Sequence, residues 1–116
     1  MSARLGRDER LRRKKDFERV LFRGKRLKQA PVAIYYAPNP DSGRRAAFIA
    51  AGRFRNAVAR NRVRRRLREI FRINQDQFAS GFDFILRGDP PAAELEFSAL
   101  RSTILDLARK VAPIEE

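Results

Sequence analysis

Apolar residues recur along this chain at two spacings, one typical of helices and one typical of strands. Spacings of three and four residues predict helices at about residues 14–23, 56–73 and 92–111. Short apolar runs bounded by turn residues predict strands at residues 31–37, 45–51 and 82–87, with a candidate fourth strand at 25–29. This order predicts an α+β fold: a two-layer α/β sandwich with a mixed sheet of about four strands and helices packed on one face.

Basic side chains are concentrated in the first two-thirds of the chain. Among the 116 residues, 27 are Lys or Arg and 14 are Asp or Glu, which gives a net charge of +13. Residues 1–72 hold 23 of the basic side chains, whereas residues 73–116 hold four basic and eight acidic ones. A small protein with one strongly basic surface indicates a polyanionic partner, with nucleic acid favoured over an anionic membrane.

The composition also excludes several classes of chemistry. The chain has no Cys and no His, which excludes disulfides, zinc fingers and hydrolases of the Ser-His-Asp or Cys-His type. We expect a single domain at residues 10–112, a flexible basic arm at 1–9 and a tail at 113–116. Because no secretory signal and no apolar run long enough to span a bilayer are visible, we expect a cytoplasmic protein.

The helix predicted at 56–73 has two opposite faces. One face is apolar and is formed by Ala59, Val63, Leu67, Ile70 and Phe71. The other holds Asn61, Arg65, Arg68 and Arg72, and Arg60, Arg62, Arg64 and Arg66 lie on the flanks. Like charges at this spacing destabilise an isolated helix, so a partner that neutralises them explains the cluster best. One guanidinium group can bind two phosphate oxygens at once. This favours RNA or DNA as the partner over a membrane surface, and over a face that only contacts solvent.

This helix also has a specific sequence motif. Residues 56–69, N-A-V-A-R-N-R-V-R-R-R-L-R-E, resemble the signature helix of the bacterial ribonuclease P protein subunit. Residues 10–24 resemble the opening R-L-x-x-x-x-x-F-x-x-V-x-x-x-G of that family, and residues 81–84 resemble its G-x-D-[FY] strand. The resemblance covers about residues 10–110. The chain departs from it at 51–55, where Arg53 stands for one Lys of the family's S-K-K segment and Arg55 for a Gly.

The resemblance implies a fold, a function and partners. The family's fold has a left-handed βαβ crossover, here from 45–51 through 56–73 to 82–87. Its function is to assist the endonucleolytic removal of the 5′ leader from precursor transfer RNA. The RNA subunit and the Mg²⁺ that it requires perform the chemistry, so the resemblance implies no catalytic and no metal-binding residue in this chain. The implied partners are one ribonuclease P RNA and the leader of precursor transfer RNA, with a monomeric protein when free and no membrane.

The resemblance also assigns residues to two RNA-binding surfaces. Contacts to the catalytic RNA are implied for Arg53, Arg60, Asn61, Arg62, Arg64, Arg65, Arg66 and Arg68. Contacts to the leader, in a cleft between the first helix and the sheet, are implied for Arg12, Arg13, Phe17, Leu21 and Tyr35. Phe17 fits two roles, packing between helix and sheet or stacking on a base. Tyr35 and Tyr36 point to opposite faces of their strand, so only one of them can face the cleft.

Three alternatives remain from the sequence. A small basic ribosomal protein has similar size, charge and fold class, and a DNA-binding regulator would use 56–73 as its recognition helix. No helix-turn-helix pair precedes that helix, which argues against the regulator. A protein nuclease would need clustered carboxylates for its metal, whereas the acidic residues here are scattered.

Arg44 and Arg45 are expected to belong to a turn between strands.

Overall fold

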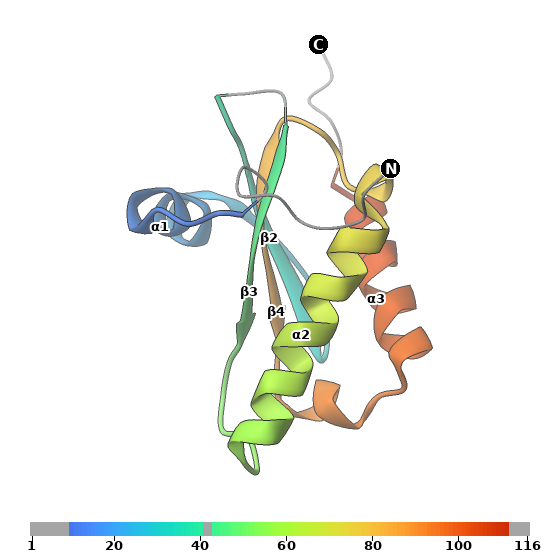
Figure 1. The fold of residues 1–116 in the computed structure, drawn as a ribbon. Helices are drawn as coiled ribbons and strands as arrows, with labels where there is room; N and C mark the ends of the chain where they lie inside the picture. Colours follow the sequence, from blue (N-terminus) through green and yellow to red (C-terminus); the bar gives the residue numbers. More distant parts are fainter. Residues whose placement is uncertain (1–9, 41–42, 112–116) are drawn as a thin grey trace.

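The computed structural model describes residues 10–40 and 43–111, which form one sheet flanked by helices (Figure 1). The predicted arm at 1–9 and tail at 113–116 lie outside the described residues. The elements in chain order are α1 (Lys14–Arg23), β1 (Lys25–Gln29), β2 (Val32–Pro38), β3 (Arg44–Ala50), α2 (Ala57–Ile73), the short 3₁₀ helix η2 (Gln75–Gln77), β4 (Phe82–Gly88), a second 3₁₀ helix η3 (Pro90–Glu94) and α3 (Phe97–Arg109).

The sheet is mixed and has four strands in the order β1-β2-β4-β3. β1 pairs with β2 and β2 with β4 in antiparallel register, while β3 and β4 are parallel. The mixed α+β architecture and the candidate strand at 25–29 are therefore confirmed. The β3–α2–β4 crossover is left-handed, because β4 lies to the left of β3 when α2 is in front and the strands point upward (Figure 1).

Helices α2 and α3 cover one face of the sheet, as the predicted sandwich requires (Figure 1). The main core lies between them and the sheet, and Phe71, Phe78 and Phe84 pack in it ring against ring. α1 lies on the opposite face, where a smaller cluster contains Val20, Tyr35 and Ile85. The sheet therefore separates the surface of α1 from the surface of α2.

Local contacts explain where α2 begins and why the last helix is shorter than predicted. The Asn56 side chain accepts a hydrogen bond from the Ala59 amide at 2.8 Å and so caps α2. The helix predicted at 92–111 is wrong at its start, because η3 ends at Glu94 and α3 begins only at Phe97. Arg66 donates to the Leu95 carbonyl at 2.7 Å, which holds the chain extended at this break.

The expected turn at Arg44 and Arg45 is also wrong, because β3 begins at Arg44; the strand predicted at 45–51 is confirmed and starts one residue earlier. Their side chains are partly buried and hydrogen-bonded. Arg44 donates to the Phe78 carbonyl at 2.6 Å, and Arg45 binds the carboxylate of Asp83. In the sequence, two adjacent arginines are typical of an exposed turn. In the structure both belong to the sheet, and their acceptors, Phe78 and Asp83, lie 34 and 38 residues further along the chain.

Gly24 ends α1 for a reason that helix-stop patterns do not give. Its φ is −79°, so no left-handed conformation is involved. A Cβ at this position would lie 2.5 Å from the Val20 carbonyl oxygen and 2.6 Å from that of Tyr36. Only a residue without a side chain allows the end of α1 to approach β2 this closely.

Gly24→Ala is therefore expected to lower the free energy of unfolding by about 1–3 kcal/mol, as overpacking does, because both obstructing atoms are backbone. Chemical denaturation measures the change. Gly43→Ala is the matched control, since a Cβ at Gly43 meets no described atom within 4 Å. Equal stability of the Gly24→Ala protein and the wild type would show that α1 can move away from β2 at no cost.

Candidate nucleic-acid interface

The outward side of α2 is a row of exposed polar and cationic side chains. Within the described residues, none of them makes a hydrogen bond or ion pair with another side chain or with the backbone. They are Asn61, Arg62, Arg64, Arg65 and Arg68. The one acidic residue of the helix, Glu69, pairs with Arg72 instead. We call these five residues the arginine face; their donors are available to a partner.

Two of the predicted RNA-binding arginines on α2 point inward instead. Arg60 donates to the Ala50 carbonyl at 2.7 Å and to the Gly52 carbonyl at 2.8 Å, and its guanidinium lies 5.0 Å from the centre of the Phe54 ring. Gly52 has a φ of +96°, which glycine adopts without strain. Arg60 therefore stabilises the loop between β3 and α2, and Arg66 stabilises the extended segment between η3 and α3.

The loop between β3 and α2 carries two further cations. Arg53 is exposed and forms no hydrogen bond or ion pair with a described residue, so its guanidinium is available to a partner. Arg55, which stands where the resembled family has Gly, lies 3.6 Å from the carboxylate of Glu94. Both side chains of that pair are exposed, so it contributes little to stability.

The opposite face of the sheet carries the second predicted surface. Phe17 and Leu21 are half-buried and pack beside Tyr35, Ala47 and Ile49. Tyr36 points to the other face, where its ring packs edge-on against Phe82. Of the two tyrosines it is therefore Tyr35 that faces α1. Arg12 and Arg13 are exposed immediately before α1 begins.

Cationic groups surround the hydroxyl of Tyr35. Arg87 on β4 donates to this oxygen at 3.3 Å and also binds Asp89 at 3.0 Å. Burial raises the pKa of the Tyr35 phenol, but interaction with the Arg87 and Arg26 guanidiniums outweighs it, and the net shift is downward. The hydrogen bonds to Tyr35 and Asp89 raise the pKa of Arg87. Tyr35 itself is only 8% exposed, so what this site offers a nucleotide is the half-buried ring of Phe17 beside guanidiniums that can bind phosphate.

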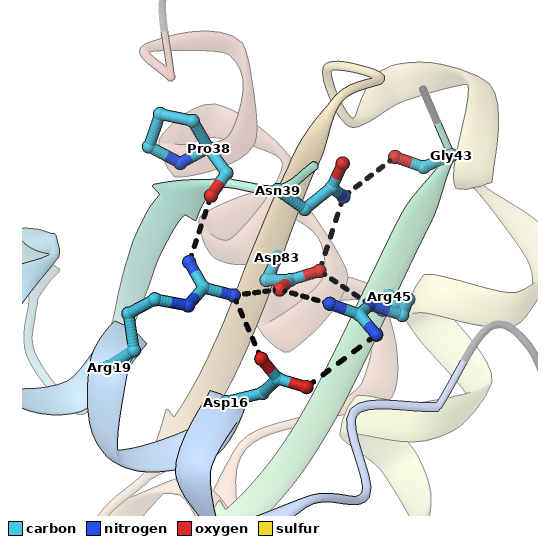
Figure 2. Close-up of polar contacts among 7 residues, drawn as sticks. All are labelled: Asp16, Arg19, Pro38, Asn39, Gly43, Arg45 and Asp83. Atoms are coloured by element: carbon cyan, nitrogen blue, oxygen red, sulfur yellow. Dashed lines mark hydrogen bonds and ion pairs between the residues drawn. The ribbon is translucent and has the colours of Figure 1, made fainter. Parts of the chain in front are cut away.

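An ion network around one buried carboxylate holds α1 against the sheet (Figure 2). Asp83 on β4 is fully buried and accepts hydrogen bonds from Arg45 at 2.9 and 2.8 Å and from Asn39 at 3.2 Å. Arg19 of α1 binds the same carboxylate and also donates to the Pro38 carbonyl at 2.8 Å.

Asp16 of α1 adds a second carboxylate to this network, 3.5 Å from Arg19 and 3.7 Å from Arg45. Asp83 belongs to the G-x-D-[FY] motif, but the motif alone assigned it no role. The signal that could have revealed its role is a lone Asp among apolar strand residues, which needs buried cationic partners.

The described residues can be compared with what a metal site and a membrane span require. Among the residues described, no three His, Cys, Asp or Glu side chains gather as metal ligands would. None of the helices in residues 10–40 and 43–111 is long and apolar enough to cross a membrane. The geometry instead places one arginine-rich surface and one aromatic, basic surface on opposite sides of a sheet. This arrangement defines a nucleic-acid-binding α+β protein.

Comparison with known proteins narrows this class to a family. The family model described as Ribonuclease P matches residues 5–112. The ribonuclease P protein component of Petrotoga mobilis is 38% identical over 110 residues, which cover 89% of this chain and 91% of that protein. That of Pelotomaculum thermopropionicum is 33% identical over 86% of this chain and 89% of its own length. The chain therefore belongs to the ribonuclease P protein family.

Solved structures agree with this assignment. The RNase P protein from Thermotoga maritima superimposes with a TM-score of 0.80 at 28% identity, covering 90% of this chain and 99% of that one. The RNase P protein of Staphylococcus aureus gives a TM-score of 0.75 over 85% of this chain and 91% of its own; at 21% identity it supports the fold alone. These matches do not favour the ribosomal alternative.

Proposed function

We propose that this chain, as the protein component of ribonuclease P, binds two RNAs at once, one on each side of its sheet. The arginine face of α2 binds the RNA subunit, and the surface between α1 and the sheet binds the 5′ leader of precursor transfer RNA. The observation that carries the proposal is the arginine face: five adjacent donors on one helix with no described partner inside the protein.

The arginine face suits a folded RNA for electrostatic and geometric reasons. Its side chains project from one rigid helix that packs on the sheet through Val63 and Leu67, so their spacing is fixed. The deep major groove of an A-form helix hides base edges from such a rod. The contacts are therefore mainly to phosphates, and they weaken steeply as salt rises.

The α1 surface suits an unpaired strand. The half-buried Phe17 and Leu21 offer apolar and aromatic area, Tyr35 is buried beneath them at 8% exposed, and Arg26 and Arg87 add charge beside it. Stacking is independent of sequence because every base has a π face, which fits a leader that differs from one transfer RNA to the next. A protein that grips the leader distinguishes the precursor from the mature product, which has none.

In this proposal the protein performs no covalent step. The RNA subunit and its Mg²⁺ hydrolyse the phosphodiester, and the protein neutralises the repulsion between RNA subunit and substrate. One protein binds one RNA. The free protein is a monomer, since copies with a net charge of +13 repel one another.

Reconstitution tests the function directly. The purified protein is mixed with a bacterial ribonuclease P RNA and 5′-labelled precursor transfer RNA at low Mg²⁺, with protein alone and RNA alone as controls. Cleavage at the mature 5′ end by the mixture only is the expected result. A mixture no more active than RNA alone would contradict the proposal.

The leader surface has its own test. Phe17→Leu keeps an apolar side chain but removes the ring, so we expect precursor binding to weaken about fivefold, the lower end for a lost base stack, with RNA-subunit binding unchanged. Phe48→Leu is the matched control, because Phe48 is also half-buried but packs in the core on the other face. Equal precursor affinity of a folded Phe17→Leu protein and the wild type would remove Phe17 from the leader surface.

A further inference from the structure

Phe22 is a large apolar side chain that the fold leaves in solvent. It lies on α1 and is 74% exposed. It follows Phe17 by five residues and so points about 140° away from it, on the side of α1 that faces away from the sheet. Lys15, seven residues before Phe22, lies on the same line of the helix. Phe22 and Lys15 line a shallow hollow together with three further cations and two carboxylates: Lys14, Arg19, Arg23, Asp16 and Glu18.

The cations around Phe22 differ in whether they are already used. Arg19 binds Asp83 and the Pro38 carbonyl, and Lys14 lies 4.0 Å from Glu18. Lys15 and Arg23 make no hydrogen bond or ion pair with any described residue. The outer face of α1, defined here as Lys15, Phe22 and Arg23, therefore offers one bare ring between two free positive charges.

We propose that the outer face of α1 binds unpaired nucleotides of the 5′ leader that extend beyond the surface between α1 and the sheet. Phe22 stacks on one base, while Lys15 and Arg23 bind the phosphates on either side of it. The chemistry is the one that single-stranded RNA offers, a π face and a regularly spaced negative charge. A second copy of this chain does not fit, because the surface and the whole molecule are strongly positive.

The position of α1 favours the leader over the RNA subunit as the occupant. α1 and α2 lie on opposite faces of the sheet, so the outer face of α1 points away from the arginine face (Figure 1). α1 has ten residues and is about 15 Å long, so a strand that leaves its inner side reaches the outer side after a short path. This inference rests on the proposed leader surface and extends it.

A tryptophan substitution tests the stacking directly. The chain has no Trp, so Phe22→Trp places a single indole on the outer face of α1. In the reconstituted holoenzyme, a precursor with a long leader is expected to quench the indole fluorescence, because a base stacks on it. A precursor whose leader is only long enough to cover the surface between α1 and the sheet should leave the emission unchanged. Quenching by the RNA subunit before any precursor is added would overturn the proposal.

Affinity supplies the second test. Phe22→Ala in the holoenzyme is expected to weaken binding of the long-leader precursor about fivefold, the lower end for a lost base stack, and to leave the short-leader precursor unaffected. Ile73→Ala is the matched control, since Ile73 is 54% exposed at the far end of α2. Thermal unfolding confirms that both variants fold.

The outcomes separate the two proposals. Equal affinity of Phe22→Ala and wild type for the long leader overturns the outer-face contact alone, provided that wild type still activates the RNA subunit and binds the short-leader precursor. An equal loss for both leader lengths assigns Phe22 to the RNA subunit and also overturns the contact. Failure of the wild-type protein to activate the RNA subunit would overturn the proposed function itself.

Discussion

Replacing Asp83 with asparagine is expected to lower the free energy of unfolding by about 3 kcal/mol. The carboxylate is fully buried and binds two guanidiniums, and an amide of the same shape can neither neutralise them nor accept all their hydrogen bonds. Arg19 and Arg45 are about a quarter to a third exposed, so water reaches them and keeps the cost at the lower end of the range for broken buried pairs. Urea denaturation measures the change.

The same substitution should destabilise α1 more than it destabilises the rest of the fold. Asp83 anchors Arg19, the side chain that ties α1 to the end of the sheet (Figure 2). Hydrogen exchange in α1 is therefore expected to accelerate more than exchange in α2. Asp89→Asn is the control, because Asp89 is also paired to an arginine, Arg87, but that pair is more exposed and its loss should cost less. Equal protection of α1 in Asp83→Asn and wild type would show that apolar packing alone holds this helix.

Repeating patterns along the chain made much of the fold predictable. The apolar spacing of α2 follows directly from the helical period, and Val63, Leu67 and Ile70 are all buried as it requires. The alternation of β2 likewise separates Tyr35 from Tyr36. Both predictions depend only on local geometry, which a sequence encodes in its spacing.

The remaining features depend on contacts between residues far apart in the chain. Arg60 and Arg66 lie on the flanks of α2, where the helical period does not decide between inward and outward. The carbonyls of Ala50 and Leu95 decide it, and no local pattern reveals where they lie. The face of the sheet on which α1 packs also depends on a distant contact, because the buried Asp83 that binds Arg19 is 64 residues further along the chain.

Helix α2 therefore contains two kinds of arginine, and they should respond differently to substitution. Arg65→Ala combined with Arg68→Ala removes two exposed side chains from the arginine face. Each phosphate-binding side chain that is removed lowers the slope of log affinity against log salt by about one, so the double variant should lose about two from this slope. Raising the salt from about 50 to 200 mM should therefore weaken its binding to the RNA subunit about tenfold less than it weakens that of wild type. Stability should stay constant or rise slightly, because like charges are removed from one helix.

Arg60→Ala should show the reverse pattern. Its guanidinium binds the Ala50 and Gly52 carbonyls and lies over Phe54, so its loss frees the loop before α2 and is expected to cost about 1–3 kcal/mol of stability. The salt dependence of RNA binding should stay close to that of wild type, because no exposed donor is removed. Filter binding over a salt series, with denaturation of each variant, separates the two effects. A reduced salt dependence in a fully stable Arg60→Ala protein would show instead that Arg60 leaves the loop carbonyls to contact RNA phosphates.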